Sequence, residues 1–88
     1  MIAYGRYNKV TFTICEVQVR EISEAEDRYC LQIKSIDGEY HMIYGCERVC
    51  ELIKRDIDID LQDNKRFIDL EYCESRSKRQ YEIELHDF

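Results

Sequence analysis

The sequence lacks the long apolar runs that mark membrane proteins and secreted precursors. None of its 88 residues belongs to a stretch near the roughly 18 apolar residues that span a bilayer, and the N-terminal MIAYGRYNKV has no apolar signal-peptide core. The five cysteines are an odd number and cannot all pair within one chain. We therefore expect a soluble protein with reduced cysteines, located in the cytoplasm.

Sequence motifs for catalysis and metal binding are missing as well. The chain has three glycines and two histidines, and it contains no glycine and serine pattern of the nucleophile-elbow kind. Asp56, Asp58 and Asp60 begin like a calcium-binding loop. Leu61 and Phe67 then stand where that loop needs a glycine and a bidentate glutamate. We therefore predict no enzymatic activity, no cofactor and no metal site.

The sequence does contain a core-forming apolar pattern and a surplus of acid. Hydrophobic residues make up 44% of the chain and charged residues 36%, with a net charge of −6. This balance predicts one globular domain over residues 1–88. A negative field repels phosphate backbones and attracts basic surfaces. We expect a basic protein as partner, without direct contact to nucleic acid or membrane.

The N-terminal segment is predicted to be an arm. Residues 1–8 show no clear periodicity and contain Tyr4 and Tyr7. Tyrosine is among the side chains that most often anchor protein interfaces. Both tyrosines are therefore candidates for contact with a partner.

Alternating apolar residues predict a long first strand from Val10 to Ile22. The apolar side chains change from one face to the other inside this segment. Such a change of face is what a β-bulge produces. We predict a bulge between Ile14 and Glu16.

Two further strands are predicted before residue 45. Polar residues 23–27 close a hairpin to a strand over 28–36, and a third strand covers 39–44. Between these two strands, Asp37-Gly38 predicts a two-residue hairpin turn of the primed type.

The apolar period changes after residue 45. A helical spacing of 3, 1 and 3 predicts a helix with a buried face at Cys46, Val49, Cys50 and Ile53. From residue 56 the pattern alternates again and predicts a strand with apolar residues Ile57, Ile59 and Leu61. Further alternation predicts strands over 68–73 and 81–86, with a polar loop at 74–78 between them.

The predicted order is β-β-β-α-β-β-β. Hairpins on both sides of a single helix favour a mainly antiparallel sheet of about six strands, with the helix packed on one face. The predicted class is therefore α+β.

Carboxylates dominate the polar side of the last three predicted strands. Alternate residues of a strand lie ~6.6–6.8 Å apart on one face, which is of the right order to imitate every second phosphate of a nucleic-acid strand. The predicted partner-binding carboxylates are Asp56, Asp58, Asp60, Asp69, Glu71, Glu82 and Glu84.

Cysteine and histidine give a different hypothesis. Cys46 and Cys50 stand one helical turn apart, with His41 five residues before the first of them. A thiolate at a helix N-terminus beside a histidine is a reactive group, and the same three residues are metal-ligand types. Helical spacing already explains both cysteines as core residues, so a small thiol- or metal-dependent enzyme or sensor is the less favoured hypothesis.

The preferred function is a non-enzymatic inhibitor that binds a basic, nucleic-acid-binding protein through its acidic faces. In size, acidity and lack of catalytic motifs, the chain resembles phage or mobile-element inhibitors of host defence, anti-CRISPR proteins among them. That resemblance implies a CRISPR effector as one type of target, in the cytoplasm of the host cell. The composition is also compatible with an immunity protein against a toxic nuclease, and with a structural homodimer joined along an edge strand.

Overall fold

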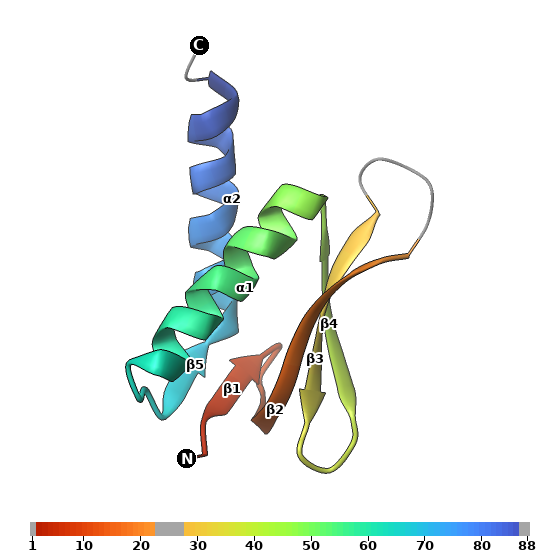
Figure 1. The fold of residues 1–88 in the computed structure, drawn as a ribbon, viewed down its shortest axis with the longest axis vertical. Coiled ribbons are helices and arrows are strands. Elements are labelled where there is room, and N and C mark those ends of the chain that lie inside the picture. The colour runs from red at the N-terminus through yellow and green to blue at the C-terminus, as the bar shows by residue number, and fades with distance from the viewer. Residues whose placement is uncertain (1, 23–27, 87–88) are drawn as a thin grey trace.

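A five-stranded mixed sheet carries two helices on one face (Figure 1). The computed structural model describes residues 2–22 and 28–86. The strand order is β4-β3-β2-β1-β5, with β1 and β5 parallel and all other neighbours antiparallel. The elements are β1 (Tyr4–Tyr7), β2 (Val10–Glu21), β3 (Tyr29–Ser35), β4 (Tyr40–Gly45), α1 (Glu47–Gln62), β5 (Phe67–Asp69) and α2 (Leu70–His86).

The predicted strands of the N-terminal half are present, and so is the bulge in β2. The pairing of β2 with β3 shifts register between Ile14 and Glu16. Cys15 is the extra residue and is exposed. The shift keeps Ile14 and Val17 on the same inner face of the sheet, because an extra residue changes the side-chain parity of the strand.

The turns differ in part from the prediction. The β3–β4 hairpin is confirmed, but its turn is not a two-residue primed turn, because within it only Gly38 has positive φ, at 89°. The N–H of Gly38 donates to Ser35 O at 3.0 Å. The two-residue turn with positive φ at both positions instead joins β1 to β2 through Asn8 and Lys9. The predicted turn at 23–27 lies outside the described residues.

The prediction of an N-terminal arm is wrong, because residues 4–7 form β1 in the interior of the sheet. β1 pairs with both β2 and β5. Gly5 faces the core, where a Cβ atom would come within 3.1 Å of Ile14 Cδ1 and Leu70 Cδ1. Packing requires a glycine at this core-facing position. Because glycine has no apolar side chain, the alternating pattern that would identify β1 as a strand is missing from the sequence.

The strand predicted from residue 56 is wrong, because α1 continues unbroken to Gln62. Ile53 and Ile57 are both fully buried, whereas Ile59 is 43% exposed. Residues four apart lie on one face of a helix, so Ile57 extends the buried stripe of the predicted helix. Packing of this stripe outweighs the weak helix propensity of isoleucine and aspartate.

The strand predicted over 68–73 is confirmed only at residues 68 and 69, which belong to β5. The last predicted strand is wrong, because residues 70–86 form one helix, α2. Its buried residues, Leu70, Cys73 and Ser77, have helical spacing. Asp69 precedes the helix and accepts a hydrogen bond from the Tyr72 N–H at 3.2 Å. This is the geometry of an N-cap, which satisfies a backbone donor that the first turn leaves free.

The hydrophobic core lies between the sheet and the two helices. α1 packs on β2, β3 and β4, while α2 packs on β1 and on α1 (Figure 1). The opposite face of the sheet carries no helix of the described chain. The core residues are Phe12, Leu31, Ile33, Ile43, Val49, Cys50, Ile53, Ile57, Ile68, Leu70 and Cys73.

Truncating Ile57 and Ile59 separately tests the helical register of α1. A strand places both side chains on one face, whereas α1 buries Ile57 and exposes Ile59. We expect Ile57→Ala to lower the free energy of unfolding by ~2–5 kcal/mol and Ile59→Ala to lower it by less than about 1 kcal/mol. Urea denaturation measures both. Equal losses for the two variants would contradict this register.

Candidate protein-binding surfaces

The three aspartates of the predicted acidic row lie on α1 and do not share one face. Successive helical residues are rotated by about 100°, so alternate residues point in nearly opposite directions. Each aspartate is neutralised within the chain. The pairs are Asp56–Arg76 at 2.9 Å, Asp58–Lys54 at 2.7 Å and Asp60–Lys65 at 3.4 Å.

The other predicted carboxylates do not form a lattice either. Asp69 caps α2, and Glu71 accepts from the Asn8 N–H at 3.1 Å. Arg48 donates to both oxygens of Glu84, at 2.9 and 2.7 Å, and thereby lowers the pKa of this carboxyl. Glu82 is exposed on α2. The segments that were expected to align these groups as strands are helical except for β5 at residues 67–69, and most of the groups serve the fold.

A groove of about 350 Å³ separates the exposed sides of α1 and α2. The Arg48–Glu84 and Arg76–Asp56 pairs cross it and link the two helices. Solvent screens exposed pairs of this kind, so each contributes little to stability. The three lining arginines, including Arg55, face two lining carboxylates. The charges of the groove nearly balance, so it joins the helices and offers no strong field.

The two predicted tyrosine anchors differ in environment. Tyr7 donates its hydroxyl to Glu74 Oε1 at 2.9 Å and thereby ties β1 to α2. Burial, followed by this hydrogen bond, raises the pKa of Tyr7 to about 12. Tyr4 is 44% exposed on the outer face of the sheet. Tyr4 is open to a partner, whereas Tyr7 is engaged within the fold.

Cys46, Cys50 and His41 lie in or against the hydrophobic core. Burial raises the pKa of Cys50 to about 11, so its thiol is protonated at neutral pH. Cys46 is half-buried immediately before α1. His41 stacks on Phe12 with ring centroids 3.7 Å apart. Within residues 2–22 and 28–86, no group of three histidine, cysteine or acidic side chains is placed to share a metal ion.

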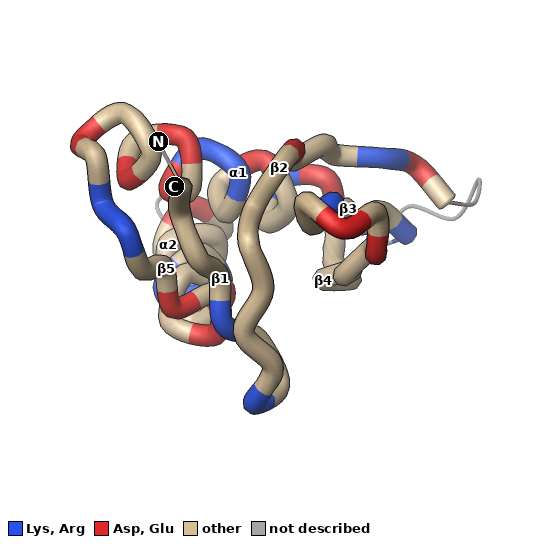
Figure 2. The backbone as a smooth tube through the Cα atoms, turned by 90° about the horizontal axis from the view of Figure 1, so that it is seen from below, with Lys and Arg blue, Asp and Glu red and all other residues tan. Residues whose placement is uncertain are grey.

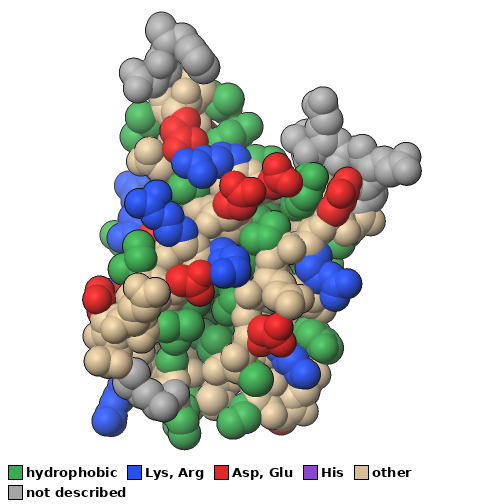
Figure 3. Space-filling model, viewed as in Figure 1, with side chains coloured by type: hydrophobic (Ala, Val, Ile, Leu, Met, Phe, Trp, Pro, Cys, Tyr) green, Lys and Arg blue, Asp and Glu red, His purple; other side chains and the backbone are tan. Residues whose placement is uncertain are grey.

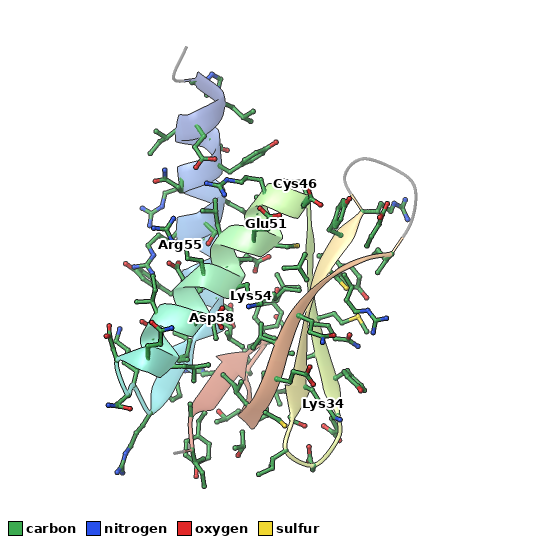
Figure 4. All side chains as sticks on the ribbon, in the orientation of Figure 1. Lys34, Cys46, Glu51, Lys54, Arg55 and Asp58 are labelled. Carbon is green, nitrogen blue, oxygen red and sulfur yellow. The ribbon has the colours of Figure 1, made fainter. Side chains whose placement is uncertain are left out.

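The structure brings together carboxylates that sequence reasoning missed. Glu21 ends β2, and Glu47 and Glu51 lie in the first two turns of α1. All three are exposed and act on Tyr29 at the start of β3. We call these four residues the acidic end, and acidic side chains gather in this region of Figure 3. In Figure 4, Glu51 lies near Cys46, where α1 begins.

Two of the three carboxylates of the acidic end, Glu21 and Glu47, form no ion pair among the described residues. Among ion pairs of the described residues, one reaches this group, between Glu51 and Arg48 at 3.9 Å. Their combined field is evident at Tyr29, whose pKa is raised first by desolvation and then by Glu21, Glu47 and Glu51. Three more acids, Glu24, Glu26 and Asp27, follow in the sequence between β2 and β3. This local charge is therefore available to an external cation.

A second exposed surface is the outer side of the sheet, which we call the open face. Its side chains form lateral rows across β2, β3 and β4, because paired residues point to the same side. Arg20 donates to Gln32 Oε1 at 3.1 Å, and Lys34 lies 5.9 Å from the centre of the Tyr40 ring. The rows are Glu16–Lys34–Tyr40, Gln18–Gln32–Met42 and Arg20–Cys30–Tyr44.

Comparison with protein-family models, curated proteins and solved structures finds no match to the chain. No helix of the described residues is long and apolar enough to cross a membrane. The functional interpretation therefore rests on the chemistry of the surfaces themselves.

Titration of Tyr29 tests the field of the acidic end. Carboxylates oppose formation of the phenolate, so the triple variant Glu21→Gln, Glu47→Gln, Glu51→Gln is expected to lower the pKa of Tyr29 towards its ordinary value. The part of the shift that comes from burial remains. NMR signals of the Tyr29 ring, followed with pH, give the value.

The matched control removes three negative charges from the predicted acidic row. Asp56→Asn, Asp58→Asn, Asp60→Asn is expected to leave the Tyr29 titration nearly unchanged, since these groups are neutralised by their partners. Equal changes in both variants would mean that net charge, and not the local cluster, sets the shift.

Proposed function

We propose that the chain is a non-catalytic inhibitor that binds a basic surface of another protein through the acidic end. The observation that carries this proposal is the contrast between two sets of carboxylates. Those of the helical row each have a cation within 3.4 Å, whereas Glu21 and Glu47 form no ion pair among the described residues and Glu51 forms one, with Arg48 at 3.9 Å.

Electrostatics favours a basic partner at this location. Like charges that lie close together repel, and a bound cation relieves that repulsion. The three glutamates are exposed, so a cation of a partner can reach their carboxylates without a large free-energy cost. Complementary charges of this kind mainly increase the association rate and specificity, and salt weakens them.

The partner class follows from the same chemistry. Protein surfaces that bind nucleic acid carry clusters of lysine and arginine that neutralise phosphates. A protein that covers such a cluster with carboxylates competes directly with the nucleic acid. We therefore propose a basic nuclease or nucleic-acid-binding effector as the target, in agreement with the resemblance to phage-encoded inhibitors of host defence.

Tyr29 adds an apolar contact to this charged surface. Its ring is half-buried and packs against the core, and its hydroxyl interacts with Glu47. Tyrosine combines a rigid apolar ring with a polar tip, which suits it to interfaces. The proposal thus keeps tyrosine-anchored acidic recognition but assigns it to Glu21, Tyr29, Glu47 and Glu51.

An affinity capture with matched variants tests the proposed function. Immobilised wild-type chain is incubated with lysate of its native host, washed at low and then high salt, and the retained proteins are identified by mass. We expect salt-sensitive capture of a nucleic-acid-binding protein whose binding to labelled nucleic acid is blocked by the free chain. The Glu21→Gln, Glu47→Gln, Glu51→Gln variant should bind it about tenfold more weakly, because three exposed pairs of ~0.5 kcal/mol each are lost.

The Asp56→Asn, Asp58→Asn, Asp60→Asn variant is the control, because it changes the net charge by the same amount. It should retain the captured protein. Equal weakening in both variants would show that the interaction depends on net charge alone, and a captured protein that still binds nucleic acid would rule out inhibition by competition.

A further inference from the structure

One edge of the sheet is a strand with free backbone groups and no charged side chain. β4 spans six residues, Tyr40–Gly45, and pairs only with β3 among the described strands. It is uncharged along its whole length in Figure 2. Edge strands of monomeric proteins are usually short, charged or covered, because their free N–H and C=O groups otherwise pair with another chain.

The hydrogen-bonding direction along β4 follows from the hairpin. The Ser35 N–H donates to Glu39 O at 2.8 Å. Successive residues of an antiparallel strand direct their N–H and C=O groups to opposite sides. His41 and Ile43 therefore bond to β3. The backbone groups of Tyr40, Met42 and Tyr44 point to the free edge. The same three residues place their side chains on the open face, with exposed fractions of 53%, 39% and 61%.

The residues of β4 on the open face, Tyr40, Met42 and Tyr44, are symmetric about Met42. The strand reads Tyr-His-Met-Ile-Tyr from residue 40 to residue 44. If a second copy pairs antiparallel with Met42 opposite Met42, then Tyr40 faces Tyr44 of the second copy on the open face. Aromatic cross-strand pairs of this kind stabilise antiparallel sheets.

We propose that two copies of the chain pair through their β4 edges, on a twofold axis that passes between the two Met42 residues. The two five-stranded sheets then form one continuous sheet. Glu39 comes opposite Gly45 of the second copy, so no like charges face each other along the seam. A second copy fits this edge better than an unrelated strand, because the outward-facing pattern is its own complement.

The position of α1 leaves this edge accessible. α1 begins directly after β4 and crosses back over β3 and β2 (Figure 1). Both helices lie on the inner face, so the open faces of the two copies join into one surface. The proposal does not depend on the acidic end, because β4 contributes none of the residues proposed to bind the basic partner.

Sedimentation equilibrium over a concentration series tests the pairing. A single strand pair is a small interface, so we expect a weak dimer that forms reversibly as the concentration rises from micromolar to millimolar. Met42→Lys places two ammonium groups opposite each other only in the dimer and should abolish it. Thr11→Lys adds the same charge to the open face away from the edge and should leave the dimer intact. The inference is overturned if the wild-type chain stays monomeric throughout, or if both lysine variants dimerise equally.

Disulfide trapping tests the register and remains informative if Met42→Lys does not fold. Residues opposite each other in a hydrogen-bonded pair have Cα atoms about 5.5 Å apart, within the range that a disulfide spans. Met42→Cys should therefore oxidise rapidly to a dimer linked through residue 42, as identified by peptide mass. Gln18→Cys, on the same face of β2, should not give this rapid product. Equal rates of dimerisation for the two variants would contradict β4 pairing.

Discussion

The packing of the apolar stripe of α1 on the inner face of the sheet is the interaction on which the rest of the structure depends. Cys50, Ile53 and Ile57 are completely buried in this contact. Each isoleucine that moves from water into the core contributes ~1.5–3 kcal/mol. Because Ile57 belongs to the stripe, the helix continues through the aspartates that follow it. That continuation decides where the negative charge of the protein is available.

The second helix completes the distribution of charge. Ser77 is small and 2% exposed where α2 meets α1, and Arg48 and Arg76 each reach across to a carboxylate of the neighbouring helix. These ion pairs neutralise Glu84 and Asp56, two of the carboxylates that the sequence predicted to bind a partner. The acidic end, at the opposite end of α1 from Asp60, forms one ion pair among the described residues, between Glu51 and Arg48.

The N-terminal half of the fold could be predicted from the sequence because its signals are local. Alternation defines β2, β3 and β4, and the change of parity reveals the bulge. The strand β1 could not be found, because Gly5 gives no apolar signal. In the C-terminal half, Ile57 and Leu61 satisfy both periods, since a spacing of four is common to strand and helix. The buried stripe of α2 includes the polar residue Ser77. Residues 74–78 therefore show no apolar pattern in the sequence and were predicted to be a loop.

The acidic end could not be predicted, because it depends on contacts between distant parts of the chain. Glu21 and Glu47 belong to different elements, and only the β2–β3 pairing together with the start of α1 places both beside Tyr29. The predicted carboxylates failed for the converse reason. Asp56, Asp58 and Asp60 alternate in the sequence, but in a helix they do not all lie on one face, and each forms an ion pair with a different cation.

The neutralisation of Asp56, Asp58 and Asp60 depends most directly on the conformation of residues 56–62. Backbone NMR assignment of the wild-type chain measures it through the Cα chemical shifts, which move in opposite directions in helices and strands. We predict continuous helical shifts from Glu47 to Gln62, with contacts between amide protons of successive residues across the whole segment. Extended shifts from Asp56 to Leu61 would contradict the account, because they would restore an aligned aspartate row and remove the pairing that distinguishes the acidic end.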